Sequence, residues 1–390
     1  MAELLIAAER IVPAAAPEVI CPGYVLIRDT EIAVVGEGPP PRPADIRLDT
    51  GVLVPGLVDL QVNGYFGAEL DAVRLDEWRM VAGRLPQTGT TAFMPTFITA
   101  PVPRLSAALR QAAGEPGGPA ARSRPPGARI LGVHLEGPFI SPLRAGAHNP
   151  EWMTEPSPEA IGELLGAGDG ILKIVTLAPE LPGALEAVAR LAAAGILVSI
   201  GHTDARASQV VAAAGAGARM VTHLFNAQRP LHHREPGVPG QALADPRLTS
   251  GLIADLHHVA QPVCVIAFAA APDRVFLVTD AAACAGMPPG RYMLGGAPIE
   301  LPAGDGVPPV RADGTLAGSA LRMDAALANM VRAGVGLPRA VAAATRIPAD
   351  LIGRPQLGRI LPGAEADLTW LGEDLRTRAT WVAGELVYHH

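Results

Sequence analysis

Eight short apolar runs, rich in β-branched residues, recur along the chain and constrain its fold more than any other feature. Each has the length and composition of a buried β-strand. Segments rich in Ala, Leu and Arg with helical spacing lie between most of them, so the pattern predicts repeated strand–helix units. Such units form a parallel sheet, and eight of them favour an α/β fold of the (β/α)8 TIM-barrel type. The runs begin at Leu57, Thr91, Ile130, Leu172, Ile196, Met220, Ser250 and Val275.

Both ends of the chain carry a different pattern. Segments such as GYVLIRD (residues 23–29) and ATWVAGELVYHH (residues 379–390) alternate like short antiparallel strands. The termini of a chain commonly lie close together at a surface. We therefore expect residues 1–53 and 355–390 to form one small β-sandwich domain, packed beside a barrel made of residues 54–354.

Composition excludes several classes of protein. The 390 residues, 49% of them apolar, suffice for one large core plus a minor domain. A net charge of -7 with no cluster of basic residues argues against a nucleic-acid partner, because a phosphate backbone needs a concentrated basic surface. Charges interrupt the longest apolar stretches, so no membrane span or membrane partner is expected. The first residues, MAELLIAAER, carry an acid where an export signal would be basic, which predicts a cytoplasmic location.

Four predicted strands end in side chains that can carry out chemistry. These residues are Glu136, His202, His223 and Asp280. Taken singly, each has a structural explanation, since a His after a strand is commonly just hydrogen-bonded and Asp280 could cap the segment that follows it. In a TIM barrel, however, the strand ends meet at one face, where catalytic groups gather. Two imidazoles and one carboxylate suit a catalytic zinc, and a further carboxylate can move the proton of a water, so the pattern indicates a metal-dependent hydrolase.

Several longer motifs carry a family resemblance. In their order along the chain they resemble the N-acetylglucosamine-6-phosphate deacetylases of the amidohydrolase superfamily, over nearly the whole sequence. The most specific are HLEGPFISPLRAGAHNP (residues 134–150) and THLFNAQRPLHHREPG (residues 222–237). The resemblance implies hydrolysis of the acetamide of N-acetyl-D-glucosamine 6-phosphate to D-glucosamine 6-phosphate and acetate, in amino-sugar catabolism and cell-wall recycling. The other motifs are PGLVDLQVNG, VTLAPE, GHTDA, LIADLHHV, LVTDAAACAG and GTLAGSALRMD.

The resemblance also implies a role for each site residue. Glu136, His202 and His223 become the metal ligands, Asp280 the general base and acid, and His148 the group that orients the acetamide carbonyl. Arg234 would pair with the phosphate, from the neighbouring subunit of a homodimer. An arginine and backbone N–H groups are the donors that a phosphate prefers. The implied substrate contacts are Ala147, His148, Asn226, Ala227, Arg234, His258, Leu316, Ala317 and Gly318.

Two departures from family patterns, at three positions, bear on the site. Gln61 and Asn63 stand where many amidohydrolases carry a His-x-His pair for a second metal, so we expect one divalent ion per chain. Zinc is expected, although two His and one Glu also accept Fe, Mn or Co. Leu256 stands where the resembled family usually has a glycine, which predicts an extra side chain at the pocket wall.

Three alternatives stay open at this point. The chain could deacetylate N-acetylgalactosamine 6-phosphate, hydrolyse a cyclic amide, or bind a sugar phosphate without turning it over. Asp280 argues against pure binding, because binding needs no proton carrier. Amidohydrolases with a carbamylated lysine need it at the end of the fourth strand, whereas Lys173 lies at that strand's start.

Overall fold

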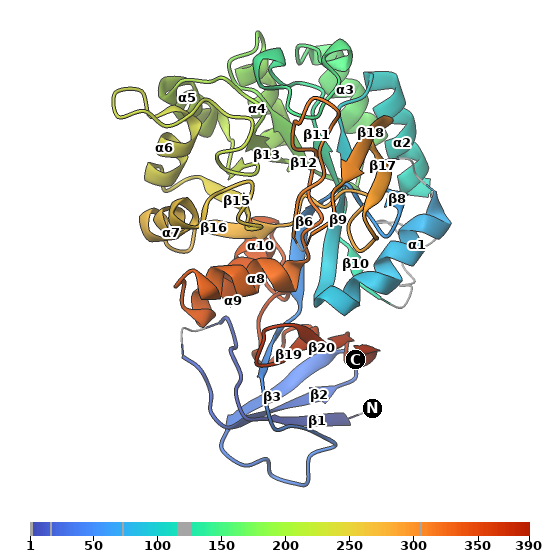
Figure 1. Ribbon diagram of the computed structural model, residues 1–390, viewed down its shortest axis with the longest axis vertical. Coiled ribbons are helices and arrows are strands. Elements are labelled where there is room, and N and C mark those ends of the chain that lie inside the picture. The colour runs from blue at the N-terminus through green and yellow to red at the C-terminus, as the bar shows by residue number, and fades with distance from the viewer. Residues whose placement is uncertain (1–2, 16–17, 72–73, 115–126, 305) are drawn as a thin grey trace.

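The computed structural model describes residues 3–15, 18–71, 74–114, 127–304 and 306–390. Its centre is a ring of eight parallel strands, ordered along the sheet as they are along the chain (Figure 1). A bridge between Val62 and Ala281 joins the last strand to the first. Every predicted run contains a strand, so the predicted barrel is confirmed. The strands are β6 (Leu57–Val62), β9 (Thr90–Ile98), β11 (Val133–Glu136), β12 (Leu172–Leu177), β13 (Leu197–Ile200), β14 (Met220–Val221), β15 (Thr249–Ile253) and β16 (Val275–Val278).

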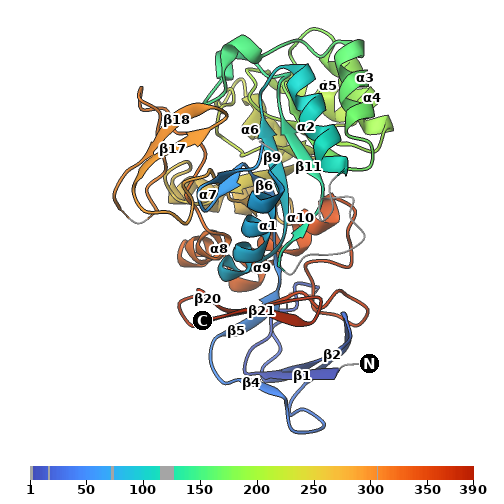
Figure 2. The ribbon, with the colours of Figure 1, turned by 90° about the vertical axis from the view of Figure 1, so that its right-hand side faces the viewer.

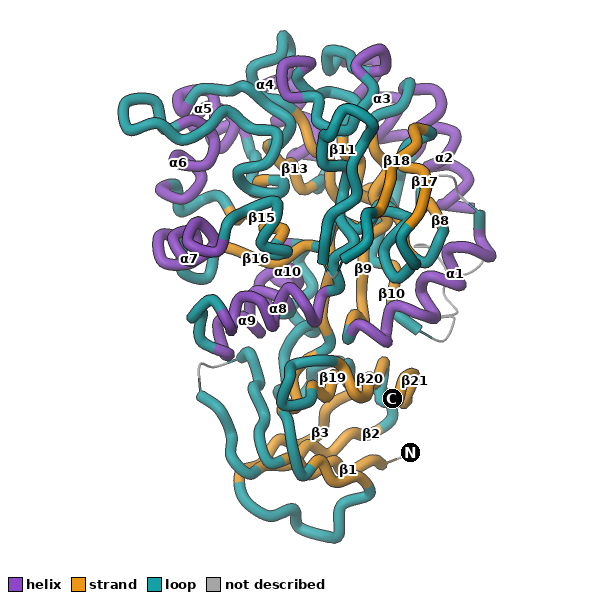
Figure 3. Tube along the Cα trace, viewed as in Figure 1, coloured by secondary structure: helices purple, strands orange, loops and turns teal. Residues whose placement is uncertain are grey.

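Helices surround this ring and cover the outer face of the strands (Figure 3). Local sequence explains them: α3 (Pro158–Ala167) begins after Ser157, whose hydroxyl accepts from a backbone N–H, with Pro at its first position. The Ala-rich helix α4 (Ala184–Ala193) buries one stripe of its surface at helical spacing. The others are α1 (Leu75–Arg84), α2 (Val102–Gly114), α5 (Ala207–Ala216), α6 (Gly237–Ala244), α7 (Gln261–Ala270), α8 (Met323–Arg332), α9 (Leu337–Ala344) and α10 (Arg346–Leu351).

The barrel strands are buried on both faces. Every residue of β9 is buried, and Phe97 packs edge-on against Trp78 of α1, with ring centroids 6.1 Å apart. Parallel strands covered by helices can be apolar along their whole length, which is why the eight runs do not alternate in polarity. Within the described ranges, no helix has the length and apolar character needed to cross a membrane.

Both ends of the chain build two small sheets below the barrel (Figure 1). The first has the order β3 (Glu31–Glu37), β2 (Gly23–Arg28), β1 (Glu3–Ala8), β4 (Ile46–Leu48). The second has the order β21 (Glu385–His389), β20 (Thr377–Val382), β19 (Leu368–Leu371), β5 (Val52–Pro55), so the two ends share one sheet. An apolar cluster joins the two sheets. Its members include Ile6, Val25, Ile27, Leu53, Leu368 and Trp381.

The predicted β-sandwich is therefore confirmed, while its boundaries at residues 53 and 355 stay a prediction. The pair β1 and β4 is parallel, whereas the other neighbouring strands of the two sheets pair antiparallel. A buried ion pair ties the sandwich to the barrel. The guanidinium of Arg129, in the short strand β10 (Arg129–Ile130) beside β9, lies 2.5 Å and 2.7 Å from the two carboxylate oxygens of Asp367. Arg129 also pairs with Glu365, and Asp367 also accepts the backbone N–H of Ala383, so this contact belongs to a larger polar network.

A hairpin that the sequence analysis did not predict flanks the barrel. Strands β17 (Gly290–Leu294) and β18 (Ala297–Leu301) are antiparallel and stand out from the edge of the barrel (Figure 2). Leu294, Ile299 and Leu301 form a small apolar cluster with Ile98 at the end of β9. The hairpin therefore adds a wall beside the face where the barrel strands end. A smaller pair, β7 (Gly64–Tyr65) with β8 (Ala68–Glu69), follows β6.

Candidate active site

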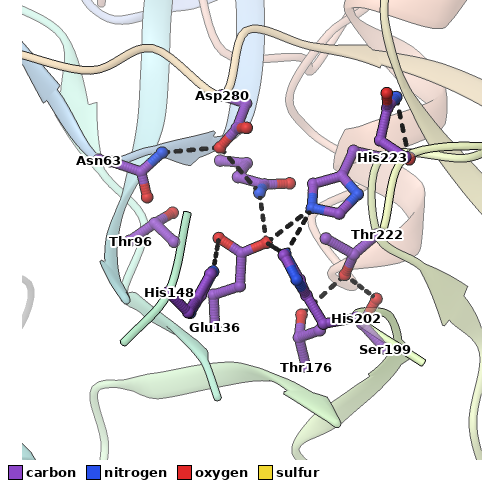
Figure 4. A network of polar contacts seen from close by, with 12 residues as sticks. Asn63, Thr96, Glu136, His148, Thr176, Ser199, His202, Thr222, His223 and Asp280 are labelled. Carbon is purple, nitrogen blue, oxygen red and sulfur yellow. Dashed lines mark hydrogen bonds and ion pairs between the residues drawn. The ribbon is translucent and has the colours of Figure 1, made fainter. Parts of the chain in front are cut away.

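The four predicted strand-end side chains converge in one place (Figure 4). Glu136 Oε1 lies 2.9 Å from His223 Nε2 and 3.3 Å from His202 Nε2, and the two Nε2 atoms are 3.0 Å apart. All of these side chains are buried, as is Asp280 beside them. The backbone turns sharply at three of these residues: His202, His223 and Asp280 have φ angles of 47°, 28° and 52°. Non-glycine residues adopt such angles at some energetic cost, a feature common at functional sites.

A hydrogen bond fixes which nitrogen of His202 faces the cluster. The Nδ1–H of His202 donates to the carbonyl oxygen of Arg144 at 2.9 Å, because a carbonyl can only accept. Its Nε2 is therefore the atom turned to Glu136. His223 also presents Nε2, and its buried Nδ1 has no partner among the described residues.

These three atoms fit a divalent cation. Ligand atoms about 2.0–2.1 Å from one tetrahedral zinc ion lie about 3.3–3.4 Å from each other, close to the separations seen here. Burial alone would raise the pKa of Glu136, but hydrogen bonds from His202 and His223 outweigh it and hold that pKa well below its usual range. An ionised carboxylate and two imidazole nitrogens that face one another are donors that a divalent cation accepts.

His148 lies beside the cluster, and contacts with Thr99 orient its ring. Its Nδ1 accepts the backbone N–H of Thr99 at 3.3 Å and lies 2.7 Å from the Thr99 hydroxyl, so Nε2 carries the hydrogen. Burial lowers the pKa of His148 to about 3, which keeps the ring neutral. Its Nε2 lies 3.9 Å from Glu136 Oε2, and Glu136, His148 and His202 are close enough to be a ligand set themselves. An N–H cannot ligate a metal, however, so this geometry favours His148 as a hydrogen-bond donor into the site.

Two amides hold Asp280. Gln61 Nε2 lies 3.0 Å from both Asp280 Oδ1 and Glu136 Oε1, and Asn63 Nδ2 donates to Asp280 Oδ1 at 2.7 Å. The amide nitrogen of Gln61 thus separates two carboxylates that would otherwise repel each other. Burial, followed by the negative charge of Glu136, raises the pKa of Asp280 to about 6. A carboxylate with such a pKa is a better proton acceptor than an ordinary aspartate.

A layer of hydroxyl groups lies beneath the cluster (Figure 4). The Thr222 oxygen is 2.7 Å from that of Thr176 and 2.6 Å from that of Ser199, and Thr176 is 2.8 Å from His134 Nε2. These contacts link β11, β12, β13 and the residue after β14. They hold together the strands that carry Glu136, His202 and His223.

A cavity of about 340 Å³ opens above the cluster. Glu136, His202, His223 and Asp280 form part of its wall. Most of the predicted substrate contacts line it too, namely Ala147, His148, Asn226, Ala227, His258, Leu316 and Gly318. Ala317 does not; it is fully buried, in the small cluster under the hairpin. Arg234 is exposed and does not line the cavity of its own chain.

A carboxylate orients His258, the predicted sugar contact. Its Nδ1 lies 2.6 Å from Asp255 Oδ2, while Asp255 Oδ1 accepts the backbone N–H groups of His257 and His258. That contact leaves Nε2 as the ring atom that can face the cavity. The expectation for Leu256 was wrong: with φ at 68° it takes a glycine-like conformation, and its side chain packs against the barrel core instead of lining the cavity.

Several residues in or beside the site were not predicted. Arg144 and Leu143 lie inside the motif that runs from residue 134 to 150, so their position was available as a signal. Thr99, which orients His148, follows β9 in the way that the other site residues follow their strands. Leu294 comes from the hairpin, and no chemical motif marks it in the sequence.

Comparison with known proteins gives consistent matches. Residues 52–387 match the model of the amidohydrolase family. The N-acetylglucosamine-6-phosphate deacetylase of Bos taurus is 38% identical over 363 residues, 89% of this chain and 86% of that protein. The N-acetylgalactosamine-6-phosphate deacetylase of Escherichia coli O157:H7 is 37% identical over 343 residues, 87% of this chain and 88% of that protein. A mutant N-acetyl-D-glucosamine-6-phosphate deacetylase from Mycobacterium smegmatis, solved with N-acetyl-D-glucosamine-6-phosphate, has a TM-score of 0.91 at 36% identity and covers 99% of this chain and 100% of its own.

Proposed function

The chain belongs to the amidohydrolase family, and we propose that it hydrolyses the acetamide bond of N-acetyl-D-glucosamine 6-phosphate to give D-glucosamine 6-phosphate and acetate. The observation that carries this proposal is the meeting of three metal-type donors, the carboxylate of Asp280 and the N–H of His148 in one cavity. Release of a primary amine from the 6-phosphate by purified, metal-analysed protein tests it. No amine release from a metal-loaded protein would overturn it.

Glu136, His202 and His223 would hold the metal. When bound, the ion supplies Lewis acidity, which makes water a better nucleophile and the amide carbonyl a better electrophile. Zinc suits two imidazoles and one carboxylate, and Fe, Mn or Co are alternatives.

Residues of the chain supply the remaining chemistry. His148 Nε2–H donates to the acetamide oxygen and stabilises the negative charge that grows there. Asp280 accepts a proton from the attacking water and delivers it to the departing amine. Asn63 and Gln61 keep Asp280 Oδ1 occupied, which directs its other oxygen to this proton transfer. His258, fixed by Asp255, contacts the sugar.

The sugar phosphate would be bound at the rim of the cavity. Asn226 and Ala227 line that rim beside His202, and we assign Arg234 of a partner subunit to the phosphate because its own chain leaves it exposed. This assignment requires that the protein forms a homodimer. A cytoplasmic location stays a prediction from the sequence.

The galacto epimer is the second candidate substrate. The relative from Escherichia coli O157:H7, named for N-acetylgalactosamine 6-phosphate, is nearly as similar as the relative from Bos taurus. Comparing kcat/KM for the two 6-phosphates on one preparation decides between the epimers. A protein that binds both but hydrolyses neither would instead be a sugar-phosphate-binding protein.

We expect purified protein to retain about one divalent ion per chain after mild dialysis, because amides are much poorer zinc ligands than imidazoles. In addition, the amide nitrogen of Gln61 occupies the space between Glu136 and Asp280, where a second cation would bind, and the amide nitrogen of Asn63 donates to Asp280 Oδ1. Elemental analysis of the dialysed protein measures this stoichiometry. Two tightly held ions would contradict the one-metal site, and a Gln61→His, Asn63→His double variant is the control expected to gain the second ion.

A further inference from the structure

The cavity holds a pronounced imbalance of charge. Two carboxylates, Glu136 and Asp280, lie in its wall, and Arg144 is the one arginine or lysine that the wall contains among the described residues. Arg311 approaches the same region, but it donates to the carbonyl oxygen of Ala147 at 3.1 Å and does not line the cavity. A substrate phosphate would bring further negative charge here, and Arg144 is the side chain of the wall whose positive charge could offset it.

Arg144 shares a carboxylate with a second arginine. Its Nε and Nη2 lie 2.9 Å and 2.7 Å from Asp204 Oδ1. Arg229 occupies the other oxygen, Oδ2, and also donates to the Asp204 carbonyl at 2.7 Å. Glu180 is nearby, but its oxygens accept from the Thr203 hydroxyl and the Asp204 N–H. Neither bond of Arg144 to Asp204 uses Nη1, and the side chain is 34% exposed, so the guanidinium is oriented but still accessible.

This arrangement is continuous with the rim around Asn226 and Ala227. The Thr203 N–H donates to the carbonyl of Ala227 at 3.0 Å, and the Arg229 N–H donates to the carbonyl of Thr203 at 3.0 Å. Two residues beyond Arg144, a Cβ on Gly146 would lie 3.8 Å from that of Ala227. Arg144 thus lies at the side of the cavity where the proposed function locates the phosphate.

We propose that Arg144 is a specificity-determining residue that contacts the substrate phosphate from within the same chain. The inference rests on the proposed function. Asp204 holds the guanidinium through Nε and Nη2, and Nη1 is left to donate to a phosphate oxygen. Arg229 pairs with the other oxygen of Asp204 but does not line the cavity. A side chain already fixed in its bound orientation loses little entropy on binding.

Arg144→Met and Arg229→Met form a matched pair of variants. Each removes one guanidinium from Asp204 and keeps an apolar stem, but only Arg144 lines the cavity. For Arg144→Met we expect KM for N-acetyl-D-glucosamine 6-phosphate to rise about tenfold, with kcat within about threefold, as for an interaction made equally in the ground and transition states. Hydrolysis of unphosphorylated N-acetyl-D-glucosamine should change by less than about twofold. Arg229→Met should leave all three quantities within about threefold of the unsubstituted chain.

Calorimetric titration with inorganic phosphate and with D-glucosamine 6-phosphate separates this inference from the proposed function. Arg144→Met should bind both about tenfold more weakly than Arg229→Met does. A chain that shows this difference but releases no amine overturns the proposed activity and keeps the phosphate contact.

Three results would overturn the role of Arg144. Equal losses on phosphorylated and unphosphorylated sugars would show that Arg144 acts through its carbonyl on His202. Equal effects of the two Met variants would show that Asp204 needs both arginines for structure. Unchanged phosphate binding in both variants would show that Arg144 does not contact the phosphate. Metal content of each variant is measured alongside, so that loss of the ion is not mistaken for loss of phosphate binding.

Discussion

Asp280→Asn is expected to keep the metal and the substrate affinity but to lower kcat by a hundredfold or more. The amide is nearly isosteric with the carboxylate, yet it cannot accept a proton from water. Asn63 and Gln61 present only N–H groups to Asp280 Oδ1, so the new side chain would turn its oxygen to them and its NH2 to the reaction. Steady-state rates on the 6-phosphate, with metal content and product affinity measured on the same sample, test this.

Substitutions of the metal ligands provide the contrast. Glu136→Ala and His223→Ala should lose metal and activity together, because each removes one of three donors that lie within 3.3 Å of one another. Asp280→Asn should lose activity alone. Near-normal turnover in Asp280→Asn with its metal retained would assign the proton transfer to another residue.

The fold could be predicted because its strands are buried on both faces. A run such as TAFMPTF needs no tertiary information to be recognised, and the strand β9 matches it closely. Much shorter strands were found in the same way: β14 has only two residues, but the apolar run from Met220 marks it. The site followed from the same logic, since parallel strand ends must meet at one face.

The unpredicted parts depend on contacts between segments far apart in the chain. The orientation of Arg144 depends on Asp204, which also binds Arg229, and no local sequence spacing connects Arg144 to either residue. The role of Gln61 as a spacer between Glu136 and Asp280 likewise needs three strands to be in place. The hairpin, by contrast, could have been predicted from local sequence. Gly295 and Gly296 lie between two alternating segments, which is a recognised turn signal, and both have positive φ.

Leu256 shows why a single departure from a family pattern is hard to interpret from sequence. The backbone keeps the conformation that glycine favours, with φ at 68°, while the side chain turns away from the cavity. Its cost is therefore a local backbone strain and not a smaller substrate site. The orientation of His258 is set by Asp255 and does not involve the Leu256 side chain.

Arg234→Ala should lower kcat/KM for the 6-phosphate by roughly 30- to 1,000-fold, the effect of losing a charge-assisted contact to phosphate. The same change should scarcely affect unphosphorylated N-acetyl-D-glucosamine, which ought to be a slow substrate already. Arg234 is exposed in a polar segment between β14 and α6, of a length more typical of a functional loop than of a simple connection. Equal losses on both sugars would mean that Arg234 supports that loop and not the phosphate.

Mixing two defective chains tests whether Arg234 acts across a dimer. An Arg234→Ala chain keeps Asp280, and an Asp280→Asn chain keeps Arg234. If the arginine serves the neighbouring site, their heterodimer contains one doubly defective site and one intact site, so activity returns that neither homodimer has. If it serves its own site, each site of the heterodimer keeps one defect and no activity returns. Absence of recovery, with subunit exchange verified by mass, would therefore confine Arg234 to its own barrel and leave Arg144 as the cation already within reach of the phosphate.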